Sequence, residues 1–137
     1  MTFVLNDSNT VPWKDSPFPG ISHKFLKIGE DACIDLTRIE SGAALPPHRH
    51  FVRQRSFFVS GVGRGLDETP LPVGSYAEVP PGARHGTRAI QEVVILNVFD
   101  GLVTWLLDDG HVFVLTREGR LEGLGKVNEF GPKRLPY

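Results

Sequence analysis

Two histidines stand one residue apart in the segment Pro46-Pro47-His48-Arg49-His50. Side chains of a β-strand alternate between two faces, so residues i and i+2 point the same way. Imidazole is a common ligand for zinc, iron, copper and nickel, and two imidazoles on one face form half of a metal site. A His-x-His pair alone is weak evidence, because many such histidines are structural or exposed. His48 and His50 are therefore candidate ligands whose support must come from the surrounding sequence.

That support comes first from the spacing around the pair. Gly42, His48, His50, Gln54 and Gly61 are spaced as in the first of the two sequence motifs of the cupin family. Glycine suits positions where strands turn tightly or take a positive φ angle. The segment thus resembles a cupin, which implies that His48 and His50 bind a metal ion inside a β-barrel.

A second segment resembles the other cupin motif. Gly74, the Pro80-Pro81-Gly82 corner and His85 match its spacing, up to a last position that is usually Asn and is Ala89 here. The rigid corner would present His85 opposite the first two imidazoles. The resemblance covers residues 42 to 89 and implies a metal site formed by His48, His50 and His85.

Gln54 departs from the pattern, because most metal cupins have Glu at this position. An amide oxygen is a neutral and weaker ligand than a carboxylate. We therefore expect Gln54 either to be a fourth ligand or to form hydrogen bonds next to the metal. Three neutral ligands leave the ion with its full charge and with open positions, which suits an anionic bidentate substrate followed by dioxygen, or zinc as a Lewis acid.

The rest of the chain reads as β-structure. Its 15 Gly and 11 Pro residues are dispersed, as expected for many short strands. Ile34 and Leu36 alternate with polar residues, which predicts a strand with one wet face. Glycines argue against a long helix over residues 117–128. We predict an all-β, single-domain cupin, an RmlC-like jelly-roll β-barrel, with strands over residues 33–40, 56–60, 75–79, 92–99, 102–107 and 111–115.

The first 31 residues are expected to be an N-terminal arm, and residues 32–137 the cupin barrel. Trp13 and Phe18 should dock this arm on the protein's own barrel or on a partner subunit. The arm and the apolar strands favour a homodimer. Phe57, Trp105 and Phe113 are expected to be packing residues more than substrate walls.

Composition excludes several function classes. The formal net charge is −1, and basic residues form no concentrated run, which argues against nucleic-acid or membrane-surface binding. No stretch reaches the roughly 18 apolar residues of a membrane helix. The lone Cys33 fits a reducing compartment. A cytoplasmic protein that binds a small molecule is expected.

Further segments resemble one cupin subgroup, the acetylacetone dioxygenases and 2,4'-dihydroxyacetophenone dioxygenases. These are residues 11–13 and 19–21, residues 83–87 and the stretch 99–111. ChrR-like cupins are the next nearest. The resemblance implies a mononuclear iron(II) held by three histidines, a β-diketone or hydroxyacetophenone-like substrate, and dioxygen that cleaves a C–C bond. The alternatives are a Zn, Mn or Ni cupin isomerase, decarboxylase or hydrolase, and a non-catalytic regulatory cupin that binds metal or ligand.

Some members of this group supply an acidic residue from between the two motifs. By position this would be Asp67 or Glu68, so Gln54, Asp67 and Glu68 are the candidate catalytic residues. Both acids lie in a turn-like stretch, and solvated charges are the favoured interpretation. His23 and His111 lie outside the motifs and are not expected to bind metal.

Overall fold

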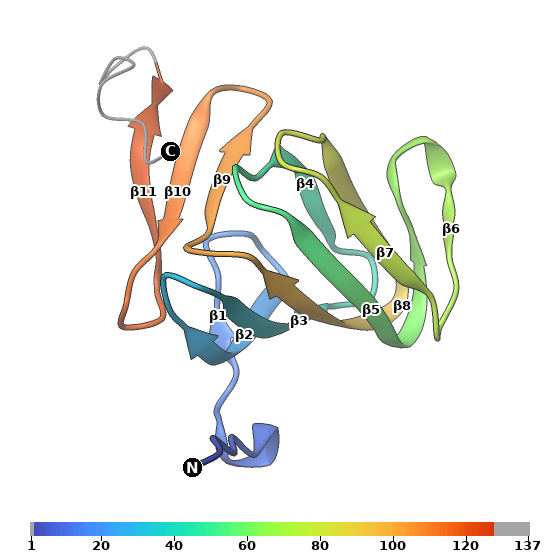
Figure 1. The fold of residues 1–137 in the computed structure, drawn as a ribbon. Coiled ribbons are helices and arrows are strands. Elements are labelled where there is room, and N and C mark those ends of the chain that lie inside the picture. The colour runs from blue at the N-terminus through green and yellow to red at the C-terminus, as the bar shows by residue number, and fades with distance from the viewer. Residues whose placement is uncertain (1, 128–137) are drawn as a thin grey trace.

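The computed structural model describes residues 2–127, which form eleven strands and two short 3₁₀ helices. The predicted all-β class is confirmed (Figure 1). Residues 128–137, the end of the expected barrel, lie outside the described part. The elements are η1 (Ser8–Thr10), β1 (Lys14–Asp15), β2 (Ile21–Ile28), β3 (Cys33–Ile39), β4 (Ala44–Arg49), β5 (Gln54–Arg64), η2 (Leu66–Glu68), β6 (Pro70–Leu71), β7 (Tyr76–Val79), β8 (His85–Phe99), β9 (Thr104–Leu107), β10 (His111–Leu115) and β11 (Leu121–Lys126).

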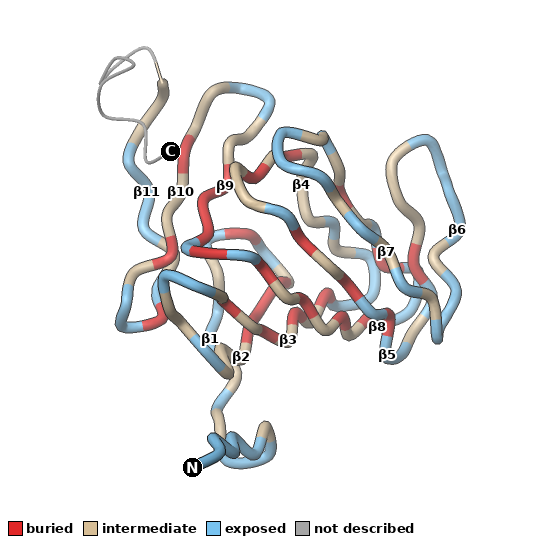
Figure 2. Tube along the Cα trace, viewed as in Figure 1, coloured by how far each residue is buried: buried red, intermediate tan, exposed pale blue. Residues whose placement is uncertain are grey.

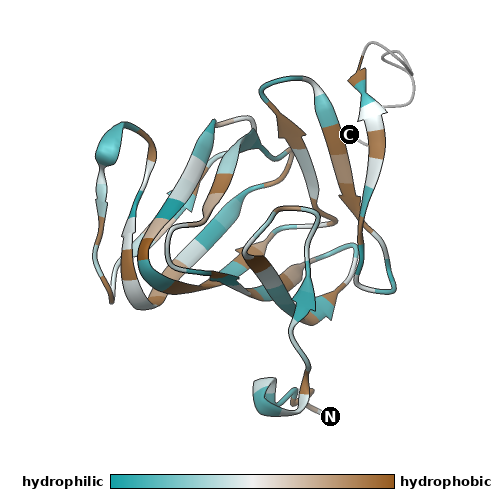
Figure 3. Cartoon of the chain, turned by 180° about the vertical axis from the view of Figure 1, so that it is seen from behind, coloured by the Kyte–Doolittle hydropathy of each residue, from teal (hydrophilic) through white to brown (hydrophobic). Residues whose placement is uncertain are grey.

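The long strand β8 organises the sheet. It pairs antiparallel with β3, β4 and β5, while β9, β10 and β11 continue the sheet from β4. Figure 1 shows the sheet curled, with β5 and β7 on one side and β9 to β11 on the other. Hydrophobic and hydrophilic residues alternate along the strands (Figure 3), as expected where each strand has an inner and an outer face. This architecture leaves an interior into which several strands can direct polar side chains.

Two clusters of buried apolar residues form the core. One joins Phe18, Ile39, Phe58 and Val93 with their neighbours, and the other surrounds Trp105. Buried residues, red in Figure 2, lie along the strands, whereas the tips of the hairpins are exposed. Ala89, which replaces the Asn of the cupin motif, is almost fully buried in the first cluster. It therefore contributes to packing at a position where the motif usually has a polar group.

The inner face of β3 is the reverse of the predicted one. Asp35 and Thr37 are buried, whereas Ile34 and Leu36 are only partly buried. The reason is strand parity, because Cys33 and Ile39 occupy the same face as the two polar residues. Polar side chains are tolerated inside only when their hydrogen bonds are satisfied.

The N-terminal segment also differs from the expected arm. Residues 21–28 form β2, which pairs with β3 from Ile21 opposite Ile39 to Ile28 opposite Cys33. The arm therefore ends before Ile21, inside the boundary expected at residue 31. Pairing along the whole strand satisfies the backbone groups that an extended arm would leave to solvent.

The two aromatic residues of the arm contact their own chain. Phe18 packs edge-to-face on Phe113, with ring centroids 5.2 Å apart. The Trp13 ring lies 4.9 Å from Lys24 Nζ and 4.4 Å from the guanidinium carbon of Arg38. These cation–π contacts hold the arm against β2 and β3.

Within residues 2–127, no helix has the length and apolar character that crossing a lipid bilayer requires. Residues 121–126 of the segment that glycines marked as a poor helix form strand β11, paired with β10.

Substitution of Gly61 should be far more damaging than substitution of Gly74. Both have positive φ angles, +94° and +86°, so any L residue costs roughly 1–2 kcal/mol in backbone strain. An added Cβ at Gly61 would also overlap the carbonyl oxygen of Glu92, whereas at Gly74 it would meet nothing within 4 Å. In urea unfolding, Gly61→Ala should lose at least twice the stability that Gly74→Ala loses. Equal losses would contradict the close approach of β5 to β8.

Candidate metal centre

Strand pairing brings His48 and His85 together. They are direct partners in the register between β4 and β8, and His50 follows β4 by one residue. The ligand atoms of the three histidines lie within 4.8 Å of one another, and His48 and His50 are almost fully buried. The structure therefore gathers the three histidines into one group that could hold a metal ion.

The hydrogen bonds of the rings fix which nitrogen faces the group. His48 Nδ1 donates to Pro46 O at 2.7 Å, and His50 Nδ1 donates to Thr104 O at 2.5 Å. His85 Nδ1 faces the backbone oxygen of Ala83 at 3.3 Å. A carbonyl can only accept, so each Nδ1 carries the proton and each Nε2 presents a lone pair.

These Nε2 atoms fit a cation. Those of His48 and His50 are 3.0 Å apart, and that of His85 is buried without a hydrogen-bond partner. Lone pairs at this separation repel each other unless a positive charge lies between them. The donor set is also chemically suitable, because neutral imidazole is the form that binds metal ions.

Burial keeps the imidazoles neutral. Desolvation lowers the pKa of His48 to about 3, and proximity to His85 adds to the effect. Desolvation also lowers the pKa of His50 well below its usual value. Burial likewise lowers the pKa of His85. At neutral pH the three side chains are therefore unprotonated at Nε2 and able to bind a cation.

The surroundings hold His50 firmly. Its ring meets those of Phe99 and Trp105 edge-to-face, with centroids 5.0 Å and 5.3 Å away. Its backbone oxygen accepts a bond from Gly82 N at 2.8 Å, which ties the Pro-Pro-Gly corner to the first motif. The ligand geometry is thus set by packing and backbone bonds before any ion binds.

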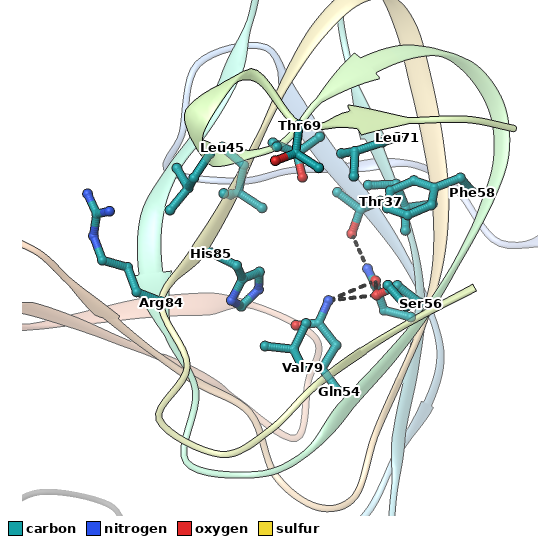
Figure 4. A pocket seen from close by; sticks show the side chains of 17 residues that line it. Thr37, Leu45, Gln54, Ser56, Phe58, Thr69, Leu71, Val79, Arg84 and His85 are labelled. Carbon is teal, nitrogen blue, oxygen red and sulfur yellow. Dashed lines mark hydrogen bonds between the residues drawn. The ribbon is translucent and has the colours of Figure 1, made fainter. Parts of the chain in front are cut away.

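Gln54 presents its amide oxygen to the site. Its Nε2 donates to Ser56 Oγ at 2.8 Å and to Asn97 Oδ1 at 3.1 Å, while its Oε1 is buried without a hydrogen-bond partner. Figure 4 shows the oxygen on the side of His85 and the nitrogen turned toward Ser56. The predicted role of Gln54 as fourth ligand requires this orientation, because an amide binds a cation through its oxygen, and the role as hydrogen-bonding neighbour of the metal is compatible with it.

A cavity of about 250 Å³ lies next to His85 and Gln54. Among the residues that line it, Arg84 is the charged one, and it forms a bidentate ion pair with Asp108, from Nε to Oδ1 at 3.0 Å and from a terminal nitrogen to Oδ2 at 2.7 Å. Most of the wall is apolar (Figure 4) and includes Leu45, Phe58, Leu71, Val79 and Ile95. Phe58 faces the cavity, while its neighbour Phe57 is exposed, so the expected packing role of Phe57 is wrong.

The structure does not bring Asp67 and Glu68 to the histidines. Both are exposed within η2, and Glu68 pairs with Arg88. Within residues 2–127, the group that could hold a metal consists of the three histidines alone. The interpretation of the two acids as solvated charges fits this placement.

The histidines outside the motifs differ from each other. His111 is partly exposed and pairs with Asp109, whereas His23 is buried and binds Asp35. Sequence reasoning missed the buried polar residues behind Gln54, which are Asp35, Thr37, Ser56 and Asn97. Each lies two residues from a buried apolar side chain on its own strand, but the sequence of one strand does not show which of its faces is buried.

Comparison with known proteins identifies the family of this chain. The model of the ChrR cupin-like domain family matches residues 2–104, which is most of the chain. The chain belongs to this family. No curated protein sequence matches it. The cupin prediction is thereby confirmed, with the ChrR-like group, which ranked second by motif, as the family that matches.

Solved structures agree on the fold of this ChrR-like cupin. KdgF from Halomonas sp. has a TM-score of 0.64 and 23% identity, over 72% of this chain and 94% of that one. An RmlC-like cupin from Shewanella frigidimarina has 0.65 and 19%, over 73% and 92%. An acetylacetone dioxygenase from Acinetobacter johnsonii has 0.62 and 16%, over 94% and 88%. At these identities the likeness shows a shared cupin fold.

Replacing His85 should abolish tight metal binding. His85→Ala removes one of three convergent Nε2 atoms, so the Co(II) dissociation constant of the purified apoprotein should rise at least tenfold. His111→Ala, a partly exposed histidine outside the group, should leave it unchanged. Equal metal retention by the two variants, measured by elemental analysis after dialysis, would contradict the site.

Proposed function

We propose that this cupin is a mononuclear iron(II) dioxygenase that cleaves a C–C bond in a small β-diketone or hydroxyacetophenone-like substrate. The observation that carries the proposal is the convergence of three unprotonated Nε2 atoms beside a mostly apolar cavity. Three neutral donors leave open positions on a bound ion. Zn(II), Ni(II) and Mn(II) also suit such donors, so metal identity is part of the test.

His48, His50 and His85 would hold the ion, and Gln54 would offer its amide oxygen to the ion or to a hydroxyl bound next to it. The metal would supply an open coordination site and redox chemistry with dioxygen. The apolar walls would exclude water and orient the substrate, and this is the larger part of what the protein itself would contribute to catalysis.

The cavity also limits the substrate. Its charged lining residue, Arg84, pairs with Asp108, which offsets part of its charge toward a substrate carboxylate. A substrate that places oxygen atoms near the histidines and apolar groups against Leu71 and Phe58 matches this lining. The volume of about 250 Å³ restricts it to a small molecule.

A second candidate function is a non-catalytic, regulatory cupin that binds metal or ligand. The match to the ChrR cupin-like family favours it. Oxygen consumption distinguishes it from the dioxygenase, and a Zn, Mn or Ni isomerase, decarboxylase or hydrolase would turn over substrate without consuming oxygen. A homodimer remains a proposal, to be measured by analytical ultracentrifugation.

Reconstitution tests the proposed activity. The apoprotein, loaded anaerobically with Fe(II), should consume one equivalent of dioxygen for each β-diketone or hydroxyacetophenone cleaved. Mass spectrometry of the two fragments should show both oxygen atoms of ¹⁸O₂ incorporated. Zinc at unit occupancy as purified, together with no oxygen uptake on any of these substrates, would overturn the dioxygenase proposal.

Narrowing the cavity should reduce turnover without affecting the metal. Ala77 lines the cavity from β7, so Ala77→Leu should lower kcat/KM at least tenfold while bound iron stays constant. Glu78→Gln changes the next residue, which is exposed, and serves as the matched control. If both variants kept wild-type kcat/KM, substrate would not bind in this cavity.

A further inference from the structure

A buried chain of hydrogen bonds leads from Gln54 away from the histidines. Gln54 Nε2 donates to Asn97 Oδ1 at 3.1 Å, and Asn97 Nδ2 donates to Asp35 Oδ1 at 3.0 Å. The other carboxylate oxygen of Asp35 lies 2.8 Å from His23 Nδ1 and accepts from Thr37 Oγ1 at 3.0 Å. The chain runs from β5 through β8 and β3 to His23 on β2.

The carboxylate sets the direction of this chain. Both oxygens of Asp35 accept hydrogen bonds, Oδ1 from Asn97 and Oδ2 from Thr37, so Asn97 turns its NH₂ group toward Asp35. The same NH₂ group also donates to Thr37 Oγ1 at 3.0 Å. The Asn97 oxygen then faces Gln54, and the Gln54 NH₂ group donates a hydrogen bond to it. The Gln54 oxygen therefore points toward the histidines. All three side chains are at most 8% exposed, so solvent cannot readily compensate for a reversed amide.

We infer that Asp35 is a positioning residue: through Asn97, it determines that Gln54 presents oxygen, not nitrogen, to the metal site. The inference rests on the proposed metal binding and deepens it. An NH₂ group aimed at the histidines would place positive hydrogens against a cation, which weakens binding.

The same chain accounts for Gln at position 54 in place of the usual Glu. A carboxylate there would face Asn97 Oδ1, acceptor against acceptor, in a buried site. Asn97 could avoid this contact between two acceptors only by turning its oxygen toward Asp35. The Asn97 oxygen and the Asp35 carboxylate would then be two acceptors facing each other. The buried acid at position 35 and the amide at position 54 are therefore coupled.

Asp35→Asn should reverse the chain. The new amide oxygen keeps the contact with His23, and the new NH₂ group faces Asn97. Thr37 Oγ1, which accepts from Asn97 Nδ2 in the wild type, can donate to the turned Asn97 oxygen by rotating its hydroxyl. Asn97 then turns its NH₂ group to Gln54, and Gln54 turns its own toward the histidines. Ser56 Oγ, which now accepts from Gln54 and donates to Asn97, can reverse both bonds by rotating its hydroxyl.

Co(II) titration of the apoprotein measures the effect on the site. Asp35→Asn should raise the Co(II) dissociation constant at least tenfold, the size seen when partners of metal ligands are changed. His23→Gln is the matched control, because it perturbs the far end of the chain without changing its direction. This control should shift the melting temperature but leave the dissociation constant within twofold of wild type.

A double-mutant cycle then tests the coupling. Gln54→Glu should lower the melting temperature of the apoprotein, and adding Asp35→Asn should restore it, because Asn97 can then donate to the carboxylate introduced at position 54. The double variant should bind Co(II) at least as tightly as wild type. This comparison decides the matter even if Asp35→Asn alone does not fold.

Two outcomes would overturn the inference. One is a lower melting temperature for Asp35→Asn with an unchanged Co(II) dissociation constant and absorption spectrum. The other is additive loss of stability in the double variant. By contrast, wild-type protein that binds no Co(II) would refute the proposed metal site itself, and that result is separable from both.

Discussion

The antiparallel pairing of β4 with β8 is the constraint on which the site depends. It places His48 directly opposite His85, and it leaves His50 to be fixed by the carbonyl of Thr104 in β9. Because side chains alternate along a strand, a slip of one residue would turn His85 to the other face of the sheet. Register, rather than any bond between the histidines, therefore assembles the three nitrogen donors. The backbone carbonyls then select the Nε2 atoms as the donors that converge.

The interior faces of the strands carry both the core and the polar chain behind the site. On β8, Val93, Ile95 and Phe99 pack in the apolar clusters, while Asn97 shares their face and bonds to Gln54 and Asp35. A polar residue at such a position stays favourable only when its hydrogen bonds are satisfied. Among the described residues, three buried side-chain atoms lack a hydrogen-bond partner: His23 Nε2 at the far end of the chain, and Gln54 Oε1 and His85 Nε2 beside the histidine group. Gln54 and His85 line the same cavity, which is where a metal and a ligand would satisfy these two atoms.

Fixed-position motifs were the part of the sequence that predicted structure best. The spacings from Gly42 to Gly61 and from Gly74 to His85 predicted the cupin fold and the grouping of the histidines. Gly42, Gly61 and Gly74 are informative because they lie at turns with positive φ angles, which glycine tolerates. Alternation alone was less reliable. On β3 it favoured Ile34 and Leu36 as the inner face, whereas the tertiary structure buries Asp35 and Thr37. A single strand cannot reveal that its polar residues have partners on β8, about sixty residues away in sequence.

The neutral donor set has an electrostatic consequence for what the site can bind. A glutamate in place of Gln54 would cancel one unit of the metal's charge and repel an anionic substrate oxygen. The amide keeps the full charge available, while the buried acid stands two hydrogen bonds away at Asp35. Coulomb interactions weaken with distance, so the displaced carboxylate opposes a bound anion less than a ligating one would. With a metal bound, an acid held behind the Asn97 and Gln54 amides would fix the orientation of Gln54 and leave the site suited to anionic oxygen ligands.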